Sequence, residues 1–235
     1  MAVNFATIDK LIEEGFLMDS RFNSPAEIAS LVSKSGVTKS MLSLPKMILL
    51  GLMAGAFIAF GGAASDVAMH GVADVGLARV VAGVIFPVGL MLVVFTGSEL
   101  FTGNCLMIIP TLEKKIKPVS MIKNLVTVYI SNFVGAMIID LLITFSGQLN
   151  YSNGGLGAFT IKVALAKTTI NPATAIISGI LCNILVCLAI VMATGATDAI
   201  GKIFGVFFPI CAFVVCGFEH CVANMYYIPA VLWRQ

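Results

Sequence analysis

Two short polar segments interrupt the longest apolar stretches of this sequence: GSELFTGN at residues 97–104 and GFEHCVAN at residues 217–224. Both follow a Phe-Pro pair, and both place Gly, Glu and Asn at the same relative positions. A straight helix through either surrounding stretch, 80–112 or 203–233, would be about 46–50 Å long at about 1.5 Å per residue. That length far exceeds the roughly 30 Å of a bilayer's hydrocarbon core. Each stretch is therefore predicted to be two half-helices that meet at a break in the middle of the membrane.

The composition also indicates lipid as the solvent. The 235 residues are 59% hydrophobic and only 11% charged, whereas soluble domains are about a quarter charged. We therefore expect an all-α integral membrane protein embedded in a lipid bilayer. The net charge is +2, and no Arg/Lys-rich stretch suggests a nucleic-acid partner. The first 44 residues lack an apolar core typical of a cleavable signal peptide.

The remaining spans predict a repeat. Three further apolar spans cover about 45–65, 119–146, with Asp140 inside it, and 171–196. Together with the broken segments they indicate an inverted repeat of three spans, with 45–146 as the first copy and 157–235 as the second. Interrupted segments at matching positions of two repeats are typical of a transport site near the midplane. The second copy lacks a counterpart of the third span. We expect a sixth span to be missing, and favour a truncated product over a five-span variant.

Residues 1–44 are predicted to form a cytosolic amphipathic arm, before the transmembrane channel domain at 45–235. Ile8 and Phe16 belong to an apolar helix face, and Ser24-Pro25-Ala26-Glu27 has the pattern of a capping box that opens a second helix. Lysines cluster in the loop after the first broken segment, which predicts a cytoplasmic loop and N-terminus. The stretch 147–161, which has no charge, is then expected to be a connection that faces outward. We therefore expect a multi-pass protein of the cell's inner (cytoplasmic) membrane.

Four polar residues are candidates for the substrate pathway. His220 is an ionisable residue at membrane depth, where such groups are costly and often functional. It could exchange protons near neutral pH, or it could be a neutral histidine that hydrogen-bonds between helices. Thr102 offers a hydroxyl to an anion or to the imidazole. Lys167 could attract anions at an outer vestibule or reach for the headgroups, and Asn183 could face the pathway or bond between helices.

Other residues of the broken segments have predicted structural roles. The matching carboxylates Glu99 and Glu219 are expected to accept backbone N–H groups freed by the breaks. Asn104 and Asn224 are assigned to the same structural set. Apolar constrictions above and below the polar centre are predicted from the large side chains near the breaks, which are Phe86, Leu90, Leu100, Phe101 and Phe213.

Three classes of function remain open from the residues alone. His220 and Lys167 favour an anion channel or a proton-coupled anion transporter. The alternative is a neutral-solute pore, since Asn171-Pro172-Ala173 matches the aquaporin tripeptide. Aquaporins carry two such tripeptides on half-helices, however, so a simple helix start is the better explanation here. A haem enzyme would need another intramembrane ligand. With two histidines and no C-x-x-C pair among six cysteines, we expect no enzyme activity, cofactor or metal.

The two broken segments, with Ser24-Pro-Ala-Glu-Ile28 and Ala54-Gly-Ala-Phe-Ile58, resemble the signature sequences of the formate/nitrite transporter family. The resemblance implies an aquaporin-like protomer of six helices, in a homopentamer with one pore per protomer. It implies small monovalent anions as substrates: formate, nitrite, hydrosulfide and, in some members, lactate. By position, His220 would be the central histidine and Thr102 the loop threonine, with Lys167 and Asn183 as the lysine and asparagine of the pathway. We favour the formate or hydrosulfide branch.

Overall fold

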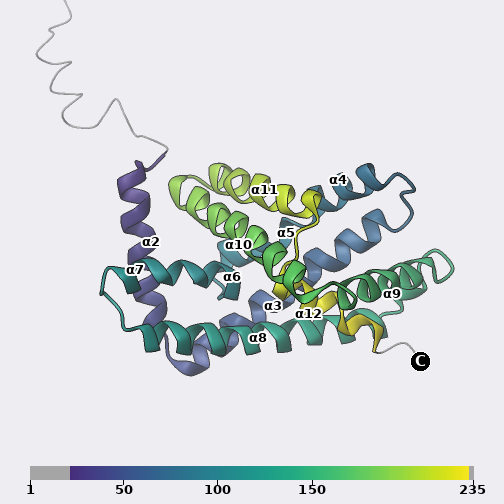
Figure 1. The fold of residues 1–235 in the computed structure, drawn as a ribbon, viewed down its shortest axis with the longest axis horizontal. Coiled ribbons are helices and arrows are strands. Elements are labelled where there is room, and N and C mark those ends of the chain that lie inside the picture. Colours follow the sequence, from purple (N-terminus) through teal and green to yellow (C-terminus); the bar gives the residue numbers. More distant parts are fainter. Residues whose placement is uncertain (1–21, 233–235) are drawn as a thin grey trace, which may run out of the picture.

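A computed structural model describes residues 22–232 of the 235-residue chain and shows a helical bundle (Figure 1). Its α-helices are α2 (Pro25–Ser40), α3 (Leu44–Met69), α4 (Val75–Ile85), α5 (Val88–Thr96), α6 (Phe101–Asn104), α7 (Ile108–Leu112), α8 (Pro118–Phe145), α9 (Gly155–Thr168), α10 (Pro172–Gly195), α11 (Ala199–Cys216) and α12 (Cys221–Tyr227). Short 3₁₀ helices are η1 (Cys105–Met107), η2 (Gln148–Asn150) and η3 (Pro229–Val231).

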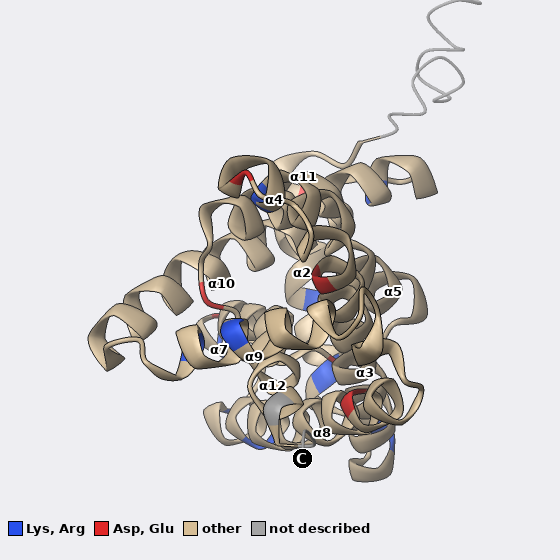
Figure 2. Ribbon diagram, turned by 90° about the vertical axis from the view of Figure 1, so that its right-hand side faces the viewer, with Lys and Arg blue, Asp and Glu red and all other residues tan. Residues whose placement is uncertain are grey.

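The described part of the chain contains five helical stretches that are long and apolar enough to cross a membrane. They are α3, the stretch 75–96 that α4 and α5 form together, α8, α10 and α11. Their bounds lie close to the predicted spans, and most of the ribbon carries no charge (Figure 2). The prediction of an all-α multi-pass membrane protein is confirmed.

Both predicted helix breaks are present. Gly97 ends α5 with φ 67° and Gly217 ends α11 with φ 73°. This left-handed conformation suits glycine because it carries no Cβ. The chain then runs extended through Leu100 or His220 before the next helix begins. The two prolines differ in effect, because α4 and α5 are separated at Pro87 whereas Pro209 lies inside α11.

The N-terminal arm is partly described. The predicted apolar face from Ile8 to Phe16 lies outside the described residues. The capping box is confirmed: the Glu27 N–H donates to the Ser24 hydroxyl oxygen, and the Ser24 N–H donates to the Glu27 carboxylate at 2.7 Å. Helix α2 packs on α7 and η1. Its Ser33 hydroxyl donates to Glu113, and this bond, with that from Lys115, lowers the pKa of the Glu113 carboxyl.

Helix α9 was not among the predicted elements. The stretch 147–161 was expected to be an outward-facing connection without charge, but most of it folds into η2 and the first half of α9. Helices α2 and α9 are counterparts, since each leads into a long span and each carries a lysine near its end, Lys39 or Lys167. In Figure 1 α2 and α9 lie at opposite ends of the molecule. The predicted boundary at residue 44 leaves α2 outside the first copy of the repeat, whereas most of α9 lies within the predicted second copy, 157–235.

Candidate pore site

His220 is the central polar residue of the site. It caps the start of α12, where its Nδ1 accepts the Ala223 backbone N–H at 3.0 Å. Its Nε2 lies 3.2 Å from the Thr102 hydroxyl oxygen. Because Nδ1 is occupied as an acceptor, the ring proton of the neutral imidazole sits on Nε2 and donates to Thr102. The two breaks are thus joined through the two residues predicted to lie on the pathway.

Aromatic rings surround this pair. The ring of Phe213 stacks on His220 with centroids 5.6 Å apart and planes 21° from parallel. The ring of Phe86 meets the imidazole edge-on at 6.5 Å. Only 4% of His220 is exposed. The two phenylalanine rings form an apolar wall around the imidazole, and the N–H edge of the imidazole is left for a hydrogen-bonding partner.

Two cavities meet at His220. The larger, of about 850 Å³, lies between α10 and the α6–α7 segment and is also lined by Thr102 and Asn183. The other, of about 630 Å³, lies among α3, α4 and α9 and is lined by Lys167 and other charged residues. Glu219 and His220 are the residues common to both. The site therefore has a polar centre with hollow space on two sides.

Each break holds the same charged cluster of a lysine, a glutamate and an asparagine. At the first, Glu99 accepts from Lys39 Nζ at 2.5 Å and from Asn104 Nδ2 at 2.6 Å. At the second, Glu219 accepts from Lys167 Nζ at 2.9 Å and from Asn224 Nδ2 at 2.8 Å.

The clusters correct two expectations. Within residues 22–232, the hydrogen bonds to Glu99 and Glu219 carboxylates come from side chains, not from backbone N–H groups freed by the break. Lys167 lines the 630 Å³ cavity, but its Nζ is bound to Glu219 and only 16% of its side chain is exposed. It does not reach for the headgroups.

The freed backbone groups find other partners. Asn132 of α8 accepts the Phe101 N–H at 2.9 Å and donates to the carbonyls of Gly51 and Glu99. At the second break, the Ser178 hydroxyl accepts the Glu219 N–H at 2.9 Å. Asn132 was missed from the sequence. The available indication was an uncharged polar residue inside an apolar span, the same feature that singled out Asn183.

Asn183 lies in the wall of the larger cavity with Thr102 and His220. Its Nδ2 faces Cys187 Sγ at 3.8 Å, and that thiol faces the Thr102 carbonyl at 3.6 Å. Its buried Oδ1 has no hydrogen-bond partner among the described residues. The amide is therefore positioned at a cavity surface with unused hydrogen-bonding capacity.

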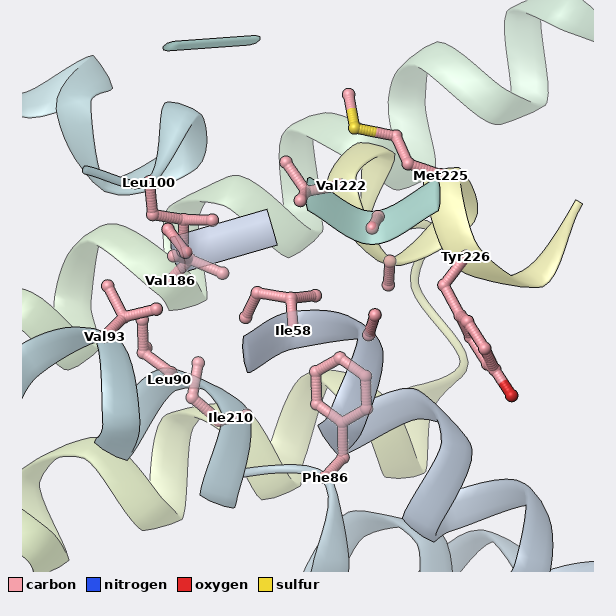
Figure 3. Packing of buried hydrophobic residues seen from close by; sticks show 14 of the residues in the cluster. Ile58, Phe86, Leu90, Val93, Leu100, Val186, Ile210, Val222, Met225 and Tyr226 are labelled. Atoms are coloured by element: carbon pink, nitrogen blue, oxygen red, sulfur yellow. The ribbon is translucent and has the colours of Figure 1, made fainter. Parts of the chain in front are cut away.

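The predicted constriction residues divide into two groups. Phe86 and Phe213 flank His220, and Phe101 lines the larger cavity while packing edge-on against Tyr129 at 4.9 Å. Leu90 and Leu100 lie in the apolar cluster around Ile58 (Figure 3). Within the described range, no three His, Cys, Asp or Glu side chains gather in an arrangement that could hold a metal ion.

Broken, apolar helices that are paired about a polar centre between two cavities define a helical membrane channel or transporter. The family model for Formate/nitrite transporter matches residues 26–235. The chain belongs to this family, as the signature segments predicted.

Relatives and solved structures agree with this assignment. The chain is 42% identical to a probable formate transporter of Methanothermobacter thermautotrophicus over 93% of this chain and 88% of that one. It is 40% identical to the formate channel BtFdhC of Bacillus thuringiensis, over 90% and 82%. A pentameric formate channel with formate bound superposes with a TM-score of 0.73 at 31% identity, covering 80% of this chain and 75% of that one. An FNT family ion channel gives a TM-score of 0.78 at 30% identity, over 86% and 81%.

Proposed function

We propose that this protein conducts small monovalent anions across the cytoplasmic membrane, with formate as the first candidate and nitrite and hydrosulfide as anions of the same size class. The observation that carries the proposal is the Thr102–His220 pair between two cavities. Similarity to formate channels supports the choice of formate. A pentamer with cytoplasmic N-termini is the assembly that we propose, by analogy with the pentameric neighbour.

The anion would enter from the 630 Å³ cavity, where Arg79, Lys162 and Lys167 raise the local positive potential. It then meets the phenylalanines around His220, where loss of hydration is costly. The Nε2–H of His220, which turns from Thr102 to the anion, and the hydroxyl hydrogen of Thr102 replace the lost water. Both are donors, so together they favour an anion over a neutral solute that needs acceptors as well.

His220 acts in this proposal as a neutral hydrogen-bond donor. Proton transfer through His220, the other role that the sequence suggests, would pass through the imidazolium. In that form Nδ1 carries a proton and can no longer accept the Ala223 N–H, which would leave a buried donor unpaired. The helix cap therefore opposes protonation of His220.

Flux measurements in proteoliposomes test the proposal. We expect the protein to pass formate faster than glycerol. We also expect His220→Phe to lower formate flux by at least about tenfold, because the anion then loses one of its two hydrogen-bond donors. A hydrogen bond to a charged group contributes about 1.5–3 kcal/mol. His70→Phe is the matched control, since His70 lies at the end of α3 and contacts Ser152 instead of the pore pair. Equal fluxes of formate and glycerol would contradict the proposal and favour the neutral-solute pore.

A further inference from the structure

A buried carboxyl group, that of Asp66, lies in the wall of the 630 Å³ cavity. Asp66 of α3 is 1% exposed, and neither carboxylate oxygen has a hydrogen-bond partner among the described residues. The side chain lines the cavity that His220 also lines. A buried ionised carboxylate without a partner is very costly, and the neutral acid is much less so.

The groups around Asp66 do not neutralise it directly. Lys167 is already bound to Glu219 at 2.9 Å. Several elements that pack around this part of α3 carry titratable or charged side chains. The cations are Arg79 of α4 and Lys162 and Lys167 of α9, and the hydroxyls are those of Tyr226 and Tyr227 of α12. The acids are Asp140 of α8 and Glu219 of the second break, which also holds His220. Cations and hydroxyls thus outnumber acids here, which makes the cavity attractive to an anion that approaches Asp66.

We propose that Asp66 is a proton-donor site for the permeating anion, a role that rests on the proposed anion conduction. The Asp66 O–H bond breaks and an O–H bond forms on an oxygen of the weak-acid anion, which leaves the Asp66 carboxylate and a neutral acid. Water in the cavity then returns a proton to Asp66 from the bulk solution. The neutral acid passes the phenylalanines at a lower cost of desolvation than the anion does.

The position of Asp66 complements that of His220. His220 lines both cavities, and its Nδ1 accepts a backbone N–H in the cap of α12. Asp66 lines only one of the two cavities, and neither of its carboxylate oxygens has a hydrogen-bond partner among the described residues. Donation of a proton at Asp66 breaks no protein hydrogen bond, and the carboxylate that remains shares its cavity with the cationic side chains of Arg79, Lys162 and Lys167.

The first test compares Asp66→Asn with Asp74→Asn in the full chain. Asparagine keeps the shape of Asp66 but cannot donate an acid proton, whereas Asp74 caps α4 at its exposed start, a role that asparagine also fills. Flux of formate is measured in proteoliposomes from about pH 5 to about pH 8, the range in which histidine also titrates. We expect Asp66→Asn to lower formate flux near neutral pH about a hundredfold, the lower end of what a positioned general acid contributes. Asp74→Asn should follow the wild type.

The second test needs no transport. Infrared difference spectra of the purified protein, recorded across the same pH range, should show a carboxylic-acid carbonyl band that Asp66→Asn removes and Asp74→Asn retains. An unchanged band in Asp66→Asn would overturn the proposal, as would a flux profile equal to that of the wild type. Absence of formate flux in the wild type would instead contradict the proposed function, and the infrared band would still decide whether Asp66 holds a proton.

Discussion

The two helix breaks share their supports but differ in their surroundings. Both begin with a left-handed glycine, and both hold a lysine–glutamate–asparagine cluster. The third residue after the glycine differs, however, because it is Leu100 in one break and His220 in the other. Leu100 lies in the apolar core, whereas His220 lines two cavities. Both copies of the repeat therefore keep the glycine and the charged cluster at the helix break, whereas only the second copy carries the central histidine.

The difference extends to the helix behind each break. Helix α8 packs along α3 and supplies Asn124 and Asn132 to the first break. In the second repeat α10 corresponds to α3. The face of α10 that carries Gly179 and Asn183 lines the 850 Å³ cavity. Within residues 22–232 the first break is enclosed by polar partners, and the second is open to space on this side. Enclosure should make the first break more sensitive to mutation.

The largest expected difference is between the two lysines. Lys39→Met leaves the Glu99 side chain, 4% exposed, without its cation, and should lower the free energy of unfolding by about 3–5 kcal/mol. Lys167→Met should cost less because the Glu219 side chain is 14% exposed and borders both cavities. Thermal unfolding in detergent, followed by loss of the monodisperse peak, measures both. The reverse order would show that enclosure does not set the sensitivity of the breaks.

A smaller difference is expected between two asparagines. Asn132→Ala removes three hydrogen bonds and leaves the Phe101 N–H and two carbonyls without this partner. The free energy of unfolding should fall by about 3 kcal/mol, because each buried polar group left unpaired costs about 1 kcal/mol or more. Asn183→Ala removes only a weak contact to Cys187 and should cost under about 1 kcal/mol. The same unfolding assay applies. Equal losses would mean that Asn183 has partners as strong as those of Asn132.

Sequence reasoning located the breaks because they depend on local chemistry. A stretch too long for one span and a glycine-containing polar segment in apolar surroundings are both visible in the sequence itself. The Ser24 capping box was predictable for the same reason. The family followed from the same two segments, and the match over 26–235 confirms it.

The contacts across the bundle could not be predicted in the same way. Lys167 meets Glu219 only because α9 forms, and the glycines and asparagines at 150–157 favour a loop in a local interpretation. The partners of Asn132 come from α3 and from the first break, which pairing by sequence alone does not reveal. Asp66 was not among the predicted site residues, because it lies just after the predicted end of the first span at about residue 65. Its importance arises from the cavity that α4 and α9 form around it.

The smallest expected difference concerns the helix faces themselves. A Cβ at Gly55 would collide with the backbone carbonyl of Asn132 in α8, so Gly55→Ala must push two spans apart. Overpacking of this kind costs about 1–3 kcal/mol. At Gly179 of α10, which aligns with Gly51 on the same α3 face, the nearest atom to an added Cβ is the Glu219 carbonyl oxygen at 3.8 Å. Gly179→Ala should therefore leave stability unchanged or raise it by up to about 1 kcal/mol through its better helix propensity. Should Gly179→Ala destabilise the protein as much as Gly55→Ala, a close-packed helix covers the α10 face in the membrane, and the two halves of the repeat are more alike than residues 22–232 show.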